Sequence, residues 1–380
     1  MIKKLVLTAL ACAAVLASLG AAKQEAKPHD WQSASLLLME CHTSQILFEQ
    51  NPDERRAPAS LTKIMTLALI CEAVAEGRLS LDDRVTATEN AARMGGSQVW
   101  LYPGEELSLH DMLRAIAAGS ANDACVAVAE HMSGSVGKFV DLMNSKAQAL
   151  GMTNTHYRNV HGMDEEGHYT SARDVGTLSR FAASLPRLLE YTSIWVEPFR
   201  GGKLELVNTN SLVRRYRGCD GLKTGWTIQS GFCVSATAKR NDLRLMAVVM
   251  GGPSSTVRFS EATRMLNMGF SSFSAVPVAP AREEAGVVAV KGGKDEAVKA
   301  VVKDEFVVVV RRGAEQNLEK EIYLPARVKA PVAAGQKLGA IVIRRDGELV
   351  AEMDLVAQHA VAKAPIWMLF VRNLGRVARY

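Results

Sequence analysis

Residues 59–76 have the sequence ASLTKIMTLALICEAVAE, and their apolar residues recur at helical spacing. Pro58 precedes the stretch and Gly77 follows it, so we expect one largely buried helix between them. Ser60 and Lys63 stand at its start, three residues apart, which puts both side chains on one face. The helix therefore brings a hydroxyl and an amine together at the edge of a hydrophobic core.

The segments around this helix contain both strand and helix patterns. Residues 34–41 and 45–49 are apolar runs separated by a short polar turn, which is typical of a β-hairpin. Residues 107–150 have helical spacing with breaks near Gly119 and Gly134. Beyond them we expect a long ordered loop at 151–170 and a helix at 174–185. Two strands at 231–238 and 243–250 and a closing helix at 260–266 should follow.

The composition shifts near residue 275, where short β-rich runs separated by Gly, Lys and Asp turns begin. This pattern predicts a small all-β domain over residues 276–363. Its expected strands are 287–290, 306–310, 340–343 and 349–355.

The overall composition describes an ordinary globular protein. With 380 residues the chain is long enough for two or three domains. Hydrophobic residues make up 48% and charged residues 22%, which excludes a disordered acidic chain and a polytopic membrane protein. The net charge of +5 is small, so no nucleic acid partner is expected.

The N-terminus has the features of a secretory signal. Lys3 and Lys4 precede the apolar run 5–19, and small residues follow, so we expect export and cleavage after Ala22. The run is too short to favour the alternative, a membrane-spanning anchor. Removing the two lysines lowers the net charge from +5 to +3.

The C-terminus predicts an amphipathic helix that lies in a membrane interface. Apolar residues including Ile366, Trp367 and Phe370 recur at helical spacing, and three arginines fall on another side, at positions 372, 376 and 379. The alternative is a terminal helix docked on the protein's own core. We expect peripheral attachment to the periplasmic face of the cytoplasmic membrane through residues 366–380. The expected segments are a signal at 1–22, a catalytic domain at 23–275, a β-rich domain at 276–363 and an anchoring helix at 364–380.

Cysteine and histidine positions predict neither a disulfide framework nor a metal site. Five cysteines remain after signal removal, and although Cys219 and Cys233 could pair across a hairpin, buried free thiols are favoured. The spacings of His156, His161 and His168 fit no standard zinc signature, which favours solvated loop histidines.

Three short motifs occur in order along the chain: Ser60-Leu-Thr-Lys63, Ser120-Ala-Asn122 and Lys223-Thr224-Gly225. Each is weak alone, and a second SxxK, Ser135-Val-Gly-Lys138, falls in a loop-like stretch. Together they predict nucleophilic catalysis. Ser60 needs a base, and a buried Lys63 beside a second cation, Lys223, has a lowered pKa and can serve.

The remaining motif residues fit supporting roles. Ser120 would link Lys63 to the leaving amine, and Asn122 would hold a substrate amide. Gly225 lets a peptide approach the backbone of its strand.

This set resembles the penicillin-recognising serine acyl transferases, and within them the low-molecular-mass penicillin-binding proteins that are D-alanyl-D-alanine carboxypeptidases. The likeness extends over four stretches and nearly the whole mature chain, with Ala121 departing from the glycine common in relatives. The four stretches are residues 57–63, 120–125, 159–164 and 220–225.

The resemblance implies an α/β domain in which an antiparallel sheet, made from the N-terminal hairpin and the 203–250 strands, is flanked by helices. It implies that Arg258 and Thr224 bind the substrate's terminal carboxylate, and that the N–H groups of Ser60 and Trp226 form an oxyanion hole. The expected substrate is a peptidoglycan stem pentapeptide, and β-lactam antibiotics should act as covalent inhibitors. No metal or organic cofactor is expected.

Three alternatives differ in activity. A β-lactamase would need a loop glutamate, and Glu165 and Glu166 lie in the corresponding loop without that class's sequence context. A D,D-endopeptidase would use the same residues on cross-linked peptides. A noncatalytic wall-binding protein should lack one of the key residues, yet Ser60, Lys63 and the other motif residues are all present.

Overall fold

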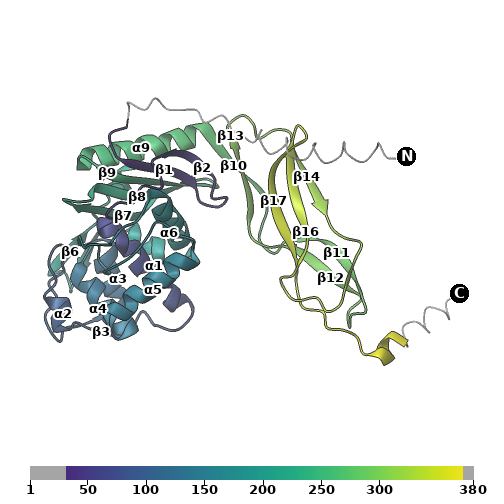
Figure 1. Ribbon diagram of the computed structural model, residues 1–380, viewed down its shortest axis with the longest axis horizontal. Coiled ribbons are helices and arrows are strands. Elements are labelled where there is room, and N and C mark those ends of the chain that lie inside the picture. The colour runs from purple at the N-terminus through teal and green to yellow at the C-terminus, as the bar shows by residue number, and fades with distance from the viewer. Residues whose placement is uncertain (1–30, 371–380) are drawn as a thin grey trace, which may run out of the picture.

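The computed structural model describes residues 31–370, which form a helix-rich body and an elongated β body (Figure 1). The predicted signal, residues 1–22, and the arginines of the predicted C-terminal helix lie outside the described residues.

The first body is built on a five-stranded antiparallel sheet with the order β2-β1-β9-β8-β7. The predicted N-terminal hairpin is confirmed, and β1 pairs with β9, for example Leu37 with Val248. This pairing joins the two ends of the domain, and it leaves β7 at one edge of the sheet. The strands are β1 (Ser35–Glu40), β2 (Ile46–Gln50), β7 (Cys219–Thr227), β8 (Gly231–Arg240) and β9 (Leu243–Gly252).

Both faces of this sheet are covered. Successive side chains of a strand point to opposite faces, so each strand contributes to two separate cores. Leu36 and Leu38 pack on the side of α9 (Ser255–Ser272), whereas Leu37 and Met39 pack on the side of the other helices. Figure 1 shows α9 on one side of the sheet and the larger helical layer on the other. That layer contains α1 (Thr62–Ala75), α3 (Leu109–Ala117), α4 (Asn122–Ser133), α5 (Val136–Ala149) and α6 (Ala172–Ser184).

Short elements complete this body. They are η2 (Ala59–Leu61), α2 (Glu89–Ala92), α7 (Leu188–Thr192), α8 (Leu212–Arg215) and the hairpins β3 (Arg84–Thr86) with β4 (Glu106–Ser108) and β5 (Val196–Phe199) with β6 (Leu204–Val207).

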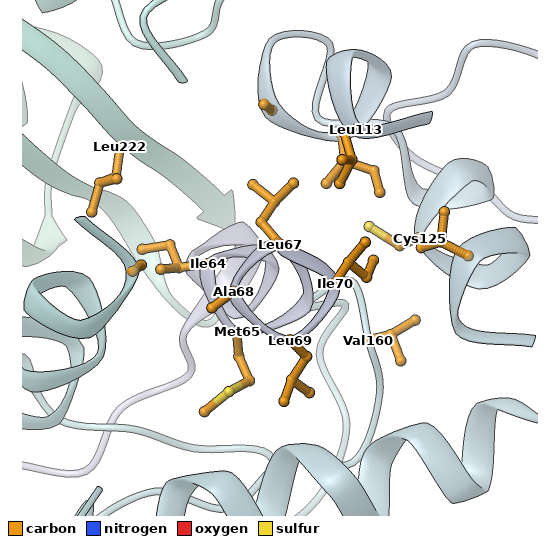
Figure 2. Packing of buried hydrophobic residues seen from close by; sticks show 14 of the residues in the cluster. Ile64, Met65, Leu67, Ala68, Leu69, Ile70, Leu113, Cys125, Val160 and Leu222 are labelled. Carbon is orange, nitrogen blue, oxygen red and sulfur yellow. The ribbon is translucent and has the colours of Figure 1, made fainter. Parts of the chain in front are cut away.

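Helix α1 is enclosed on all sides, which explains why its sequence is almost entirely apolar. Figure 2 shows its side chains radiating outward, with Ile64 toward Leu222 of β7 and Ile70 toward Cys125 of α4. The predicted buried helix is confirmed, but Ser60 lies in the 3-10 turn η2 that precedes α1. The surrounding core therefore fixes the start of α1 in place.

Two helix predictions needed correction. The closing helix runs from Ser255 to Ser272 and is much longer than expected. Its earlier start is set by Ser254, whose side chain caps the helix by accepting a hydrogen bond from the Val257 N–H. Residues 135–138 are not loop-like: Ser135 caps α5, and the exposed Lys138 lies inside that helix.

The second body contains two sheets, the pair β10-β13 and a six-stranded sheet of order β14-β16-β17-β12-β11-β15. The four predicted strands are present as β11, β13, β16 and β17, whereas β10, β12, β14 and β15 were not predicted. Much of β14 (LEKEIY) is polar and partly exposed, so it lacks a strand-like apolar alternation. The strands are β10 (Phe273–Ala279), β11 (Glu284–Lys291), β12 (Ala297–Val302), β13 (Phe306–Arg311), β14 (Leu318–Tyr323), β15 (Arg327–Lys329), β16 (Lys337–Arg345) and β17 (Glu348–Ala357).

The described chain ends in a helical turn at residues 366–370, where Ile366, Trp367 and Phe370 are exposed. Within residues 31–370, no helix is long and apolar enough to cross a membrane.

Substituting Leu37 tests the sheet core. Leu37 is fully buried between β1 and the helical layer, so Leu37→Ala should lower the free energy of unfolding by about 2–5 kcal/mol in urea titrations. The matched control Val196→Ala, at a side chain that is 42% exposed, should change it by less than about 0.5 kcal/mol. Equal losses in both variants would contradict this assignment of the core.

Candidate active site

Ser60 and Lys63 meet at the junction of η2 and α1. The Lys63 Nζ donates to Ser60 Oγ at 2.7 Å and to the backbone carbonyl of His161 at 2.8 Å. The Lys63 side chain is fully buried, whereas Ser60 is partly exposed. The serine hydroxyl is therefore accessible to a substrate, while the amine beside it is shielded from water.

Burial lowers the pKa of Lys63 to about 8, because the charged ammonium loses its hydration. Lys223 is also fully buried, and both desolvation and the Lys63 charge hold its pKa well below the usual value. A lysine that is partly neutral near pH 8 can accept a proton from a serine hydroxyl.

Lys223 and Thr224 both hydrogen-bond to Thr209, which lies in none of the sequence motifs. Lys223 Nζ donates to Thr209 Oγ1 at 3.3 Å and to the Thr224 carbonyl at 3.1 Å. The Thr224 hydroxyl donates to Thr209 Oγ1 at 2.7 Å. Thr209 follows β6 in a short polar stretch, and no sequence motif distinguishes it from other loop threonines.

Strand β7 lies directly against the serine. A Cβ on Gly225 would lie 2.9 Å from the Ser60 nitrogen and 2.8 Å from the Ala59 Cβ, so only glycine fits this contact. On the other side, a Cβ on Gly162 would lie 1.8 Å from the Ala59 carbonyl oxygen. Ser60 is thus held between an edge strand and the 159–162 loop. Trp226, next in β7, is 55% exposed at this edge.

Ser120 and Asn122 lie at the turn between α3 and α4. Ser120 is buried and adopts a left-handed backbone conformation with φ of 60°, which is strained for a residue other than glycine. Asn122 Nδ2 donates to the Gly95 carbonyl at 2.7 Å, and the Asn122 N–H donates to the Ser97 carbonyl at 2.7 Å. This turn is therefore attached to the loop that follows α2.

Arg258 lies in the first part of α9, the helix that packs on β8 and β9. Its Nη1 donates to the carbonyls of Gly225 and Cys233 at 3.1 and 3.3 Å, and its guanidinium stacks on Phe232 and Phe259. Burial lowers its pKa to about 10. Arg258 thus supports the strand that lines the site and supplies positive charge beside it.

Three further residues, His161, Asp174 and Glu165, have defined contacts. His161 contributes its backbone carbonyl to Lys63, and burial lowers its own pKa to about 3. Asp174 accepts from the Asn154 N–H and the Thr155 hydroxyl. Glu165 accepts from Asn159 Nδ2 at 3.0 Å.

The loop histidines and the cysteines are likewise occupied or enclosed. His156 contacts the Gly167 carbonyl, and His168 lies between the Thr62 hydroxyl and the Arg158 N–H. His161 and His168 are buried rather than solvated, which corrects that expectation. Cys219 and Cys233 are free and buried, as predicted, and so are Cys41, Cys71 and Cys125.

A serine that is hydrogen-bonded to a buried lysine, beside the edge strand of a helix-covered antiparallel sheet, is typical of serine hydrolases of the penicillin-binding class. The chain belongs to the D-alanyl-D-alanine carboxypeptidase family, whose model matches residues 21–254, and a model of the penicillin-binding protein 5 C-terminal domain matches residues 273–363. It is therefore a D-alanyl-D-alanine carboxypeptidase, and the predicted fold, family and activity are confirmed.

The relatives are similar over most of their length. The D-alanyl-D-alanine carboxypeptidase DacF of Bacillus subtilis is 38% identical over 93% of each chain, and DacC of Escherichia coli is 33% identical over 90% of this chain and 87% of its own. The crystal structure of Haemophilus influenzae penicillin-binding protein 5 has a TM-score of 0.77 and 31% identity, covering 89% of this chain and all of its own.

The pKa of Lys63 predicts the pH dependence of acylation. As base, Lys63 must be neutral, and it loses its proton as pH rises through about 8, so the rate of acylation by a fluorescent penicillin should rise with pH and level off above that value. The variant Lys138→Ala, which alters the second SxxK lysine, should keep this profile. A rate that is constant from pH 6 to 9.5 would exclude Lys63 as the base.

Proposed function

We propose that this carboxypeptidase cleaves the terminal D-alanine from peptidoglycan stem pentapeptides through an acyl-enzyme on Ser60. The observation that carries the proposal is the 2.7 Å hydrogen bond between Lys63 Nζ and Ser60 Oγ. The Lys63 side chain that makes this bond is fully buried. A hydroxyl is a weak nucleophile at neutral pH and needs such a base.

In the acylation step, Ser60 Oγ attacks the carbonyl carbon of the penultimate D-alanine, and its proton passes to neutral Lys63. The carbonyl oxygen becomes an oxyanion, for which the N–H groups of Ser60 and Trp226 are the proposed donors. The close packing of Gly225 on the Ser60 nitrogen supports this assignment, because it brings β7 next to the backbone of the nucleophile.

Collapse of this intermediate breaks the peptide bond to the last D-alanine. We assign Ser120 to relay the proton from Lys63 to the departing amine, with Lys223 behind it. Water then attacks the ester and Lys63 accepts its proton. As the bond between the acyl carbon and Ser60 Oγ breaks, Lys63 returns that proton to Oγ and the shortened peptide leaves. The chain's own lysines and serines supply every proton transfer, without a metal or organic cofactor.

The substrate's terminal carboxylate is assigned to Thr224 and Arg258, and its amide to Asn122. The Arg258 guanidinium donates to the Gly225 carbonyl of β7, so a positive charge lies beside the proposed peptide path. The Thr224 hydroxyl, which Thr209 Oγ1 contacts at 2.7 Å, lies next to Gly225 on the same strand.

The proposed reaction also predicts inhibition by β-lactams, whose strained amide would acylate Ser60 in place of the peptide. A penicillin-binding protein D2 of Listeria monocytogenes, 29% identical with a TM-score of 0.58 over 63% of this chain, has been solved in an ampicillin-bound form. That similarity supports the proposal for Ser60.

Replacing the nucleophile tests this mechanism. Ser60→Ala should lower D-alanine release by at least about a thousandfold and abolish the labelled-penicillin adduct, with an unchanged melting temperature. The control Ser135→Ala, in the second SxxK, should keep both activities. Release should be measured on a stem pentapeptide and a cross-linked dimer side by side, so that carboxypeptidase and endopeptidase activities are separated. Substantial release by Ser60→Ala would overturn the assignment.

We further propose that the protein is exported by residues 1–22 and held at the periplasmic face of the cytoplasmic membrane by residues 364–380. The exposed Ile366, Trp367 and Phe370 at the start of that segment support membrane contact. The β-rich part, residues 276–363, would act as a stalk between the anchor and the catalytic part, residues 23–275.

Deleting residues 365–380 tests the anchor. The truncated protein should move from the membrane pellet to the soluble fraction and keep its activity on a soluble pentapeptide, because the deletion is remote from Ser60. Replacing Ile366, Trp367 and Phe370 together by serine should have the same effect. Unchanged membrane fractionation of both variants would exclude this segment as the anchor.

A further inference from the structure

Two aromatic side chains project from a loop beside the candidate active site. Trp100 is 67% exposed and Tyr102 is 63% exposed, although rings of this size are usually well buried. They lie two residues apart in residues 95–104, between α2 and β4. We call Trp100 and Tyr102 the aromatic ledge. The mechanism above does not use them.

The buried carboxylate of Asp123 holds this loop from one side. Asp123, in the first turn of α4, accepts from the Val99 N–H at 3.1 Å and the Leu101 N–H at 3.0 Å. Its side chain is fully buried, and Val99 and Leu101 are also buried. The two residues that flank Trp100 are thus anchored, which turns the indole outward.

Arg200 and Glu105 hold the loop from the other side. The Arg200 guanidinium donates to the Val99 and Trp100 carbonyls and forms two 2.7 Å hydrogen bonds with the Glu105 carboxylate. Glu105 in turn accepts from the Tyr102 N–H at 3.2 Å. The exposed rings therefore belong to a backbone with fixed hydrogen bonds.

The backbone of Trp100 itself is strained. Its φ is 54°, in the left-handed region that residues other than glycine rarely occupy. Such conformations cost free energy and persist where surrounding contacts enforce them, commonly at ligand sites. The same loop begins at the site, because Asn122 hydrogen-bonds to the carbonyls of Gly95 and Ser97. Trp100 follows Ser97 by three positions, so their backbones lie at most about 11 Å apart.

The composition of the loop indicates the kind of ligand. Residues 95–104, GGSQVWLYPG, contain no charged side chain, and the two charged groups that support them, Asp123 and Arg200, are occupied by the loop backbone and Glu105. Flat rings suit the apolar face of a neutral sugar, and the same loop carries two uncharged polar side chains, Ser97 and Gln98, of the kinds that hydrogen-bond to a sugar's hydroxyl and acetamido groups. These side chains suit the charged residues of a stem peptide less well.

We propose that the aromatic ledge binds the neutral amino sugars to which the stem peptide is attached, so that the enzyme prefers glycan-linked pentapeptide over free pentapeptide. This inference rests on the proposed function. A stem peptide has three residues between the reacting D-alanine and the sugar, which span about 11 Å when extended. That length is comparable to the distance along the loop from the Asn122 contact to Trp100.

The test compares two substrates, the free stem pentapeptide and the same pentapeptide linked to its disaccharide of N-acetylated amino sugars. In the double variant Trp100→Ala/Tyr102→Ala, kcat/KM should fall roughly tenfold on the disaccharide-linked substrate and stay unchanged on the free peptide. Trp100→Phe, which keeps an aromatic ring, should recover most of the preference. The rate of acylation by a fluorescent penicillin should not change, which verifies that the variants are folded.

Matched controls are Val287→Ala and Leu349→Ala, which remove exposed apolar side chains from the β-rich body and should leave both values unchanged. An equal loss on both substrates would show that the ledge binds the peptide, and no loss on either would show that it binds neither; both results overturn the proposal. Failure of the proposed function is a separate result, since the wild-type protein would then release no D-alanine from either substrate.

Discussion

The burial of the Lys63 amine is the constraint on which the rest of the structure depends. An ammonium without water strongly favours losing its proton, and here the amine is held between the Ser60 hydroxyl and the His161 carbonyl. The enclosure requires the 159–162 loop to cross closely over η2, which is possible only with glycine at position 162. Asn159 fixes this loop by accepting from the N–H groups of His161 and Gly162.

The cost of burying Lys63 beside Lys223 is offset by the surrounding core. Helix α1 is apolar in every direction, so the same element that positions the amine also contributes a large buried hydrophobic area (Figure 2). Strand β7, on which Lys223 lies, is anchored on its inner side by pairing with β8 and by Arg258 behind Gly225. Its outer edge is left unpaired in the sheet, and that edge is where a peptide can lie.

Much of this architecture follows from local sequence patterns. The hairpin at residues 34–49, the enclosed helix and the helix breaks at Gly119 and Gly134 were predicted because local periodicity and turn residues specify them. The length of α9 was not, since its outward-facing positions are polar and its start depends on the Ser254 cap. Strand β14 was missed for a similar reason, because half-exposed edge strands carry weak alternation.

The sequence by itself determined which groups are available for catalysis: Ser60, Lys63, Ser120 and Lys223 stand in ordered motifs, and short-range helix geometry already pairs the first two. Only the tertiary structure decided their surroundings. The His161 carbonyl accepts from Lys63, Thr209 accepts from Lys223, and Asp123 and Arg200 hold the 95–104 loop. These hydrogen bonds connect residues that are 14 to 101 positions apart in the chain. Contacts of this kind leave no periodic signal, because they arise from how separate elements pack and not from spacing along the chain.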